Sequence, residues 1–232
     1  MKLLTAAKKY ISTHKRILFI LYFPFYMVWF TALERWTDRN FTVLHCPLDD
    51  GIPFVNWFII PYYIWFVYVG VSVALFYFCE KPENTVRLYT ALVTGMTITL
   101  LIYTVWPNAV SLRPADVENK GLLAPLVDKL YKIDTDTNVC PSLHVLNTLF
   151  VTKAYMEGTL LKKKPAIKTL LVILSYLIIV STLFLKQHSF IDIAAAFGLY
   201  IAVTAFIYNP NWFKDKKEND GAAGPADNQN SN

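Results

Sequence analysis

The chain has 232 residues, of which 55% are apolar, 16% aromatic and only 17% charged. The charged residues gather between long apolar runs, and about 20 apolar residues are what a helix needs to cross a hydrocarbon core. This pattern excludes an ordinary soluble enzyme and predicts a multi-pass membrane protein. The formal net charge of +5 has to be interpreted loop by loop, and it gives no reason to expect a nucleic-acid partner.

Residues 1–16 form a basic, polar arm, which we expect to lie on the cytoplasmic membrane surface. The apolar run 17–33 comes next. It is followed by Glu34-Arg35-Trp36 rather than by the small residues of a signal-peptide cleavage site, so we interpret it as a retained first span. Pro24 within this run is compatible with a membrane helix, because neighbouring helices can satisfy the freed carbonyl group.

Five more apolar runs follow in the chain. They cover residues 54–78, 88–106, 142–161, 169–185 and 189–208. The predicted fold class is therefore all-α, a polytopic membrane bundle of six transmembrane helices over residues 17–208. Residues 209–232 are rich in Asn, Lys, Gly and Ala, and we predict that they form a disordered cytoplasmic tail.

Positive charge is distributed unequally between the two sides of this bundle. The arm, the tail and the connections 80–87 and 153–168 hold 15 of the 22 Lys and Arg residues, whereas the opposite segments hold 7. Because positive loops stay in the cytoplasm, both termini are predicted to be cytoplasmic. The remaining connections, 34–53, 107–141 and 186–188, then face outward from the cell membrane, on the non-cytoplasmic side.

One outward connection has the sequence Lys186-Gln187-His188-Ser189-Phe190-Ile191-Asp192. His188 and Asp192 are four residues apart, so on a helix they lie on one face, one turn from each other. Ionisable residues at the mouth of a hydrophobic segment are costly and are candidates for function. The structural alternative is a snorkelling Lys186 beside a capping His188.

A second histidine motif, Pro141-Ser142-Leu143-His144, begins the fourth predicted span. In a bundle it lies on the same side as His188 and as the dipeptide Arg113-Pro114. Helix N-termini favour anions, Ser142 adds a hydroxyl, Arg113 a forked donor and Lys186 a point charge. These three residues are therefore the candidate binding residues for a phosphate.

The two histidines differ in their sequence neighbours. Asp192 can orient His188 and strengthen it as a nucleophile. His144 has no such partner nearby in the sequence, so it is free to protonate a leaving alkoxide and later to activate water. The candidate catalytic residues are His144, His188 and Asp192. Their spacing matches no set of metal ligands, and we predict no metal and no other cofactor.

These motifs resemble those of the type 2 phosphatidic acid phosphatase family, whose superfamily includes the vanadium haloperoxidases. The family pattern is Lys-x6-Arg-Pro, then Pro-Ser-x-His, then Ser-Arg-x5-His-x3-Asp. Arg113-Pro114 matches the end of the first motif, residues 141–144 match the second in full, and Ser181, His188 and Asp192 match the third. The resemblance covers residues 17–208.

The resemblance implies a phosphohistidine mechanism, in which His188 attacks phosphorus, Asp192 orients it, and His144 is first the acid and then the base. Two positions depart from the pattern, because Trp106 and Thr182 stand where the family has Lys and Arg. We expect Lys186 to replace the missing cations. The Lys-Gln-His segment is also similar to that of inositol phosphorylceramide synthases, a branch that transfers a phospho-headgroup between lipids.

The predicted function is hydrolysis of a phosphate monoester or diphosphate on a lipid such as phosphatidic acid or a polyprenyl diphosphate. The alternative is a phosphotransferase of the inositol phosphorylceramide or sphingomyelin synthase kind. A third interpretation is a binding or transport protein that kept the fold without turnover. The expected partners are the phosphorylated lipid substrate and membrane lipids, and the sequence leaves the lipid and the oligomeric state open.

Two features of the outer loops have competing interpretations. Asp49 and Asp50 precede Gly51 and indicate a solvated turn, with the steering of a polar headgroup as the alternative. A disulfide between Cys46 and Cys140 would join the first outer loop to the second histidine motif, although membrane proteins with few cysteines usually leave them free.

Overall fold

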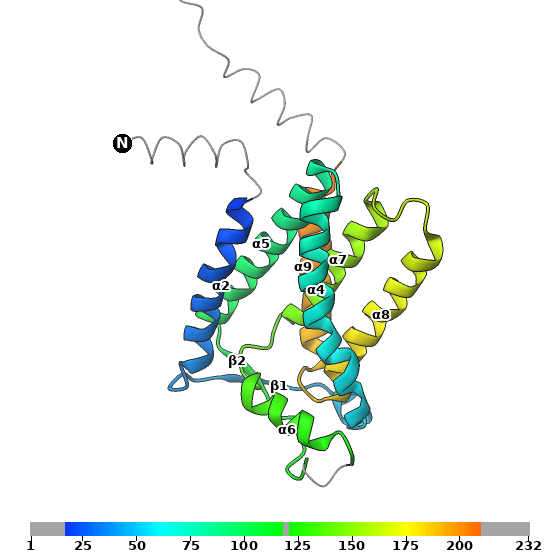
Figure 1. Ribbon diagram of the computed structural model, residues 1–232. Coiled ribbons are helices and arrows are strands. Elements are labelled where there is room, and N and C mark those ends of the chain that lie inside the picture. The colour runs from blue at the N-terminus through cyan, green and yellow to red at the C-terminus, as the bar shows by residue number, and fades with distance from the viewer. Residues whose placement is uncertain (1–16, 118–120, 210–232) are drawn as a thin grey trace, which may run out of the picture.

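The computed structural model describes residues 17–117 and 121–209 of the chain. Long helices form the body of the molecule, as Figure 1 shows. These are α2 (Ile17–Arg35), α4 (Ile59–Cys79), α5 (Pro82–Val105), α7 (Leu143–Glu157), α8 (Pro165–Phe184) and α9 (Phe190–Ile207). The predicted arm at 1–16 and the predicted tail from residue 210 onward lie outside the described residues.

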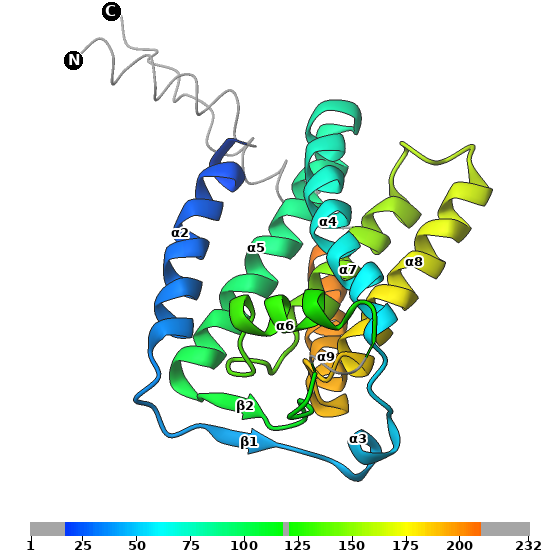
Figure 2. The same cartoon turned by 60° about the horizontal axis from the view of Figure 1, so that its bottom comes forward.

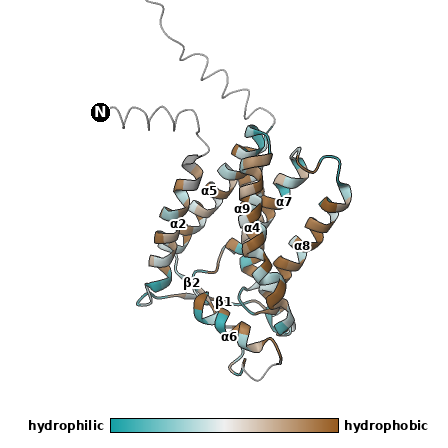
Figure 3. Cartoon of the chain, viewed as in Figure 1, coloured by the Kyte–Doolittle hydropathy of each residue, from teal (hydrophilic) through white to brown (hydrophobic). Residues whose placement is uncertain are grey.

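The composition of these helices is that of a membrane protein. Among the described residues, four segments are long and apolar enough to cross a bilayer, namely Asn56–Cys79, Pro82–Val105, Pro165–Phe184 and Phe190–Ile207. Hydrophobic residues cover most of their length, as Figure 3 shows. Helix α2 is not among the four, and α7 has only 15 residues. The predicted helical membrane architecture is confirmed, whereas the count of six spans remains a prediction.

The predicted spans differ from the observed helices by up to six residues at their ends, and the third and fourth spans show why. The third was expected from residue 88, but α5 begins at Pro82, where proline fits because first-turn N–H groups have no helical partner. The fourth was expected to reach residue 161, but α7 ends at Glu157. The carboxylate of Glu80 accepts the Thr159 hydroxyl and, at 2.8 Å, the Leu160 N–H, and these bonds hold the chain in a turn.

Helix α7 is the centre of the packing and lies against α4, α5, α8 and α9. The close approach of α5 to α7 depends on Gly95, since a Cβ atom there would lie 2.5 Å from Cε2 of Phe150. Helix α2 packs against α5 at the edge of the bundle. This arrangement leaves room between α2 and α4, where the cavity described below lies.

Folded loops with β1, β2, α3 and α6 cover one end of the bundle, as Figure 2 shows. Strand β1 (Thr42–Leu44) pairs in parallel with β2 (Asn108–Val110). The other elements here are α3 (Pro47–Gly51), η1 (Asn56–Phe58) and α6 (Ala124–Ile133). Helix α6 buries its apolar side in a small second core whose residues include Ile59, Tyr62, Val127, Leu130 and Leu185. The predicted outer loops therefore form a folded cap beside the histidine motifs.

Candidate active site

The first turn of α9 holds one half of the candidate site. Ser189 is the N-cap of the helix, and its N–H donates to Oδ2 of Asp192 at 2.8 Å. The same oxygen lies 3.2 Å from Nδ1 of His188. A carboxylate only accepts hydrogen bonds, so Nδ1 carries the proton and Nε2 keeps its lone pair. Asp192 is fully buried. The predicted pair of His188 and Asp192 therefore has the geometry of an oriented nucleophile.

The first turn of α7 holds the other half. Ser142 is the N-cap of this helix, and its backbone N–H donates to the Asp192 carbonyl at 3.2 Å, which ties the two helix starts together. The ring centroid of His144 lies 5.7 Å from that of His188. The His144 ring packs between Tyr62 and Trp65, with centroids 4.6 and 4.3 Å away. The structure thus brings both predicted histidines to one place.

Asp134 lies at this site, although no sequence pattern singles it out. Its Oδ2 lies 3.8 Å from Nε2 of His144 and accepts hydrogen bonds from the Tyr62 hydroxyl and, at 3.3 Å, from Nε2 of Gln187. It follows α6 in the long loop, ten residues before His144, and no motif or helical spacing relates the two. Only the folding of α6 over the bundle end brings this carboxylate to the imidazole.

Arg113 lies beside the site, outside the set of cavity-lining residues. Its guanidinium donates to the Tyr131 and Asp134 carbonyls, at 3.1 and 2.6 Å, and to Oε1 of Gln187 at 2.5 Å. It also lies over the Tyr131 ring, 4.3 Å from the centroid. In this position Arg113 fixes Gln187, the neighbour of His188, and the loop that carries Asp134. Its predicted contact with substrate phosphate stays a prediction.

Asp49 and Lys186 connect α3 to the loop that carries His188. The buried Asp49 carboxylate accepts the Phe190 N–H at 2.8 Å, the Ser189 hydroxyl at 2.7 Å and the Cys46 N–H at 2.9 Å. Burial by itself raises the pKa of this carboxyl, but the hydrogen bonds outweigh burial, and the pKa is lowered. Lys186 donates from Nζ to the Asp49 carbonyl at 2.7 Å. The structure therefore shows Lys186 as a tether, and its predicted role toward phosphate remains a prediction.

The remaining outer-loop residues are also placed. Asp50 is exposed and pairs with His45 at 2.8 Å, as expected for a solvated turn. The same expectation was wrong for Asp49, whose carboxylate is buried and hydrogen-bonded. Cys46 and Cys140 are both free thiols, as is usual for membrane proteins with few cysteines, and they do not form the disulfide considered above. Cys140 is buried beside Asp192, and burial together with that carboxylate raises the pKa of the Cys140 thiol to about 12.

The two positions that depart from the family pattern have structural roles. Trp106 ends α5, and its indole Nε1 donates to the Thr42 hydroxyl at 3.1 Å. Thr182 is fully buried, and its carbonyl accepts the N–H groups of Gln187 and His188 at 3.0 and 3.2 Å. Both residues shape the loops around the site, and neither supplies a positive charge.

A cavity of about 770 Å³ leads from the histidines into the bundle. Its walls come mainly from α2, α4 and α5, and both His144 and His188 lie at its polar end. The lining on α2 extends from Phe19 to Glu34, which is about 22 Å along a helix axis. Most of this lining is aromatic or aliphatic, so the cavity is long and apolar and has a polar end.

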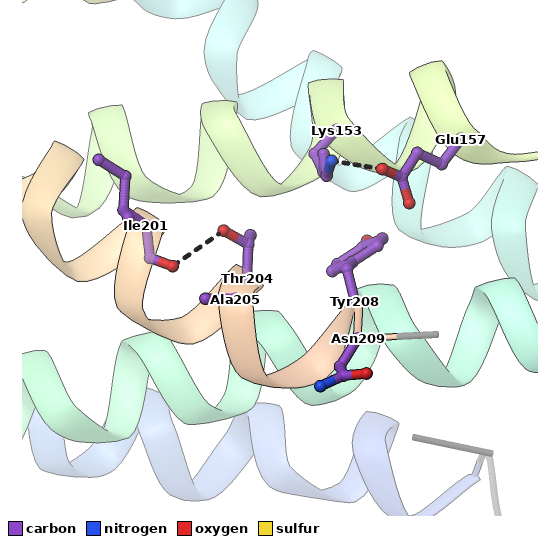
Figure 4. A pocket seen from close by; sticks show the side chains of 7 residues that line it. All are labelled: Lys153, Glu157, Ile201, Thr204, Ala205, Tyr208 and Asn209. Carbon is purple, nitrogen blue, oxygen red and sulfur yellow. Dashed lines mark hydrogen bonds and ion pairs between the residues drawn. The ribbon is translucent and has the colours of Figure 1, made fainter. Parts of the chain in front are cut away.

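A second hollow, of about 450 Å³, is lined by residues of the C-terminal halves of α7 and α9, and Figure 4 shows their side chains. Lys153 and Glu157 form an ion pair on its wall, and Lys153 lies 5.5 Å from the ring centroid of Tyr208. Because Lys153 and Tyr208 lie near the C-terminal ends of their helices, this hollow is remote from the histidines. It contains none of the candidate catalytic residues.

Comparison with known proteins gives one match. The family model described as the PAP2 superfamily matches residues 28–206, which include both histidine motifs, Asp192 and Arg113. No curated protein matches the chain, and no solved structure does.

Proposed function

Because the chain belongs to the PAP2 superfamily, we propose that it is an integral-membrane lipid phosphatase that hydrolyses a lipid phosphate monoester or diphosphate through a phosphohistidine on His188. Membership of this superfamily and the four apolar helices support a membrane phosphatase-type function. The observation that carries the mechanism is the pairing of His188 with Asp192 at 3.2 Å, with the His144 ring 5.7 Å away.

In the proposed reaction, Nε2 of His188 attacks phosphorus and the bond to the lipid oxygen breaks. Asp192 holds the Nδ1 proton and stabilises the imidazolium that forms, as in other oriented histidines. His144 gives its proton to the leaving alkoxide. It then takes a proton from water, which attacks phosphorus and releases His188. Asp134, 3.8 Å from Nε2 of His144, is placed to stabilise the protonated form of that ring.

The starts of α7 and α9 supply the binding site for the phosphate in this proposal. Helix N-termini present free N–H groups and the positive end of the dipole. Ser142 caps one of them, and its hydroxyl can turn toward a phosphate oxygen. Arg113 and Lys186 would add positive charge from the two adjoining loops, as the sequence predicted.

The long cavity supports a lipid as the substrate. Its apolar walls suit acyl or prenyl chains, and transfer of such chains from water is strongly favourable. In this arrangement the chains lie between α2 and α4, and the phosphate lies at the histidines. We further propose six spans in the cell membrane, with cytoplasmic termini and the site on the non-cytoplasmic face, as the distribution of Lys and Arg predicts.

Transfer of a phospho-headgroup to a lipid alcohol is the second candidate, as in the inositol phosphorylceramide synthase branch. One observation favours it, since the side chains of His144 and His188 are only 12% and 7% exposed. Restricted access of water at the histidines gives a lipid acceptor an advantage. The chemistry at His188 is the same in both candidates, and only the acceptor of the phosphoryl group differs.

The test is a product assay with purified protein in detergent, without added divalent metal. The substrates are phosphatidic acid, a polyprenyl diphosphate, and a phospholipid offered with ceramide or diacylglycerol. Free phosphate that disappears in His188→Ala supports hydrolysis. A new phospholipid without free phosphate supports transfer, and folded protein that forms neither product contradicts both and favours a binding or transport role.

A further inference from the structure

The polar end of the large cavity is rich in negative charge. Two carboxylates, Glu34 and Asp134, line it, and none of its lining residues in the described part of the chain is Lys or Arg. Oδ2 of Asp134 lies 3.8 Å from Nε2 of His144. Within the same described residues no Lys, Arg or His forms an ion pair with Glu34. Glu34 accepts only from neutral donors, the Thr135 hydroxyl and, at 3.0 Å, Nδ2 of Asn138.

Two buried acceptors without hydrogen-bond partners line the same cavity as this carboxylate. The side-chain carbonyl oxygens of Asn138 and Asn147 accept no hydrogen bond, and these residues are 5% and 4% exposed. Both residues line the cavity. A buried acceptor that stays unpaired costs about 1–3 kcal/mol, so a ligand that brings donors or positive charge would relieve this cost. The two amide oxygens and the two carboxylates therefore all favour a ligand that carries hydrogen-bond donors or positive charge.

Aromatic rings complete the surroundings. Tyr26 and Phe30 lie on the same face of α2 as Glu34, at four-residue intervals, and their ring centroids are 5.9 Å apart. Trp65 lies on the opposite wall, against His144. All three line the cavity. Aromatic faces attract ammonium groups, most strongly where water is excluded.

From these three observations we propose that the cavity binds a phospholipid whose headgroup carries an ammonium ion, with Glu34 as its counter-charge and the phosphodiester at His188. The inference rests on the proposed phosphohistidine chemistry at His188 and develops the second candidate function, transfer of a phospho-headgroup, because its substrate is a phosphodiester rather than a phosphate monoester or diphosphate. The headgroup lies between Glu34 and the rings of α2 and α4, and the acyl chains continue along the apolar part of the cavity.

Charge balance favours such a zwitterion over a phosphate monoester. A phosphodiester carries one negative charge, and the ammonium group cancels it, whereas phosphatidic acid brings up to two uncompensated charges. Like charges repel, and in a site of low dielectric constant the repulsion is much stronger than in water. A cavity that holds two carboxylates but no Lys or Arg among its described lining residues therefore selects against the more anionic lipids.

The corresponding reaction has two steps. Nε2 of His188 bonds to phosphorus, the bond from phosphorus to the diacylglycerol oxygen breaks, and that oxygen takes the proton of His144. An acceptor hydroxyl, from water or a lipid alcohol, then gives its proton to His144 and attacks phosphorus. The bond between phosphorus and His188 breaks, and the phospho-ammonium headgroup leaves on the acceptor.

The test measures binding and turnover separately. Binding of dioctanoyl phosphatidylethanolamine, phosphatidylcholine, phosphatidylglycerol and phosphatidic acid to His188→Ala protein is followed by isothermal titration in detergent. Phosphatidylglycerol is the matched ligand, since it carries the same phosphodiester without a cation. We expect both ammonium lipids to bind at least about tenfold more tightly than it does, which is about 1.4 kcal/mol.

Substitutions then locate the counter-charge. In the His188→Ala protein, a second substitution Glu34→Gln should remove the preference for ammonium lipids over phosphatidylglycerol. Glu34→Asp keeps the negative charge and should retain this preference. Asp50→Asn is the control, because it removes an exposed acidic charge from the same end of the bundle and should leave the preference unchanged. Equal binding of phosphatidylglycerol, or a preference that survives Glu34→Gln in folded protein, overturns the inference.

Turnover by the protein with His188 intact distinguishes this inference from the proposed function. If phosphatidic acid is hydrolysed and no ammonium preference exists, the function stands and the inference fails. If the ammonium preference exists and no lipid is turned over, the binding inference stands and the enzymatic proposal fails.

Discussion

Replacing Asp49 by Ala should destabilise the protein and disorder the loop that carries His188. Asp49 is 1% exposed, and its carboxylate accepts three hydrogen bonds, two of which come from Ser189, the N-cap of α9, and Phe190, its first residue. A net hydrogen bond to a charged group is worth about 1.5–3 kcal/mol, and such values do not add fully. Because the Ser189 hydroxyl can rotate to another partner, we expect a loss of about 3–5 kcal/mol.

The assay is thermal unfolding in one detergent, with Asp50→Ala as the matched control. Asp50 is the next residue, and its carboxylate is exposed and bound only to His45, so its removal should cost less than about 0.5 kcal/mol. For a chain of this size, 1 kcal/mol corresponds to about 2–4 °C, so Asp49→Ala should melt about 6–20 °C lower. Its rate of lipid turnover should fall as well, since His188 loses its anchor.

The effect of Asp49 should also depend on pH in a definite direction. The folded protein lowers the pKa of the Asp49 carboxyl, so its stabilising contribution is complete above the unfolded value near 3.8 and is lost as the pH falls through the lower folded value. The difference between the natural protein and Asp49→Ala should therefore be constant from pH 5 to 8 and shrink in acid. Equal melting of Asp49→Ala and Asp50→Ala at pH 7 would refute the reasoning.

Three further predictions follow from the site and the helix packing. His188→Ala should lower lipid turnover by a factor on the order of 10³ or more and abolish the phosphoprotein. His144→Ala should still form the phosphoprotein from substrates whose leaving group needs no proton, and the phosphoprotein should accumulate. Rapid-quench labelling measures both outcomes. Arg113→Ala should lower turnover about 10–100-fold, because Gln187 and the loop that carries Asp134 lose their hydrogen bonds to the guanidinium. Arg113→Lys should restore little of the activity, since one ammonium group cannot replace three directed hydrogen bonds. Full activity in either variant contradicts a positioning role for Arg113. Gly95→Ala should cost about 1–3 kcal/mol in thermal unfolding because its Cβ meets Phe150, and Gly198→Ala, with open space around it, should cost nothing; equal melting points would show that α5 and α7 are less tightly packed.

The sequence predicted the helical membrane architecture and the pairing of His188 with Asp192, because both depend on local properties. Runs of apolar residues give spans, and a four-residue interval on a helix gives neighbours. The convergence of the histidine motifs also followed from the order of the motifs along the chain. Each of these inferences needs only the chain direction and one helical turn.

The contributions of Asp134 and Asp49 were not predictable in this way. Asp134 reaches His144 because α6 folds over the bundle end, and Asp49 reaches α9 across 140 residues of chain. Neither residue belongs to a repeating pattern, so a solvated turn was the natural interpretation of Asp49. The end of α7 at Glu157 was missed for the same reason, since the Glu80 carboxylate that holds the following turn comes from a distant connection.

The most direct test of the central claim is to locate the covalent intermediate. Purified protein is mixed with a lipid substrate labelled at phosphorus, quenched in alkali, which preserves phosphohistidine, and analysed by mass spectrometry of its peptides. We predict a single phosphorylated histidine, His188, and no label in His188→Ala. Turnover with the label on another residue, or turnover by His188→Ala at an undiminished rate, would show that His188 is not the nucleophile.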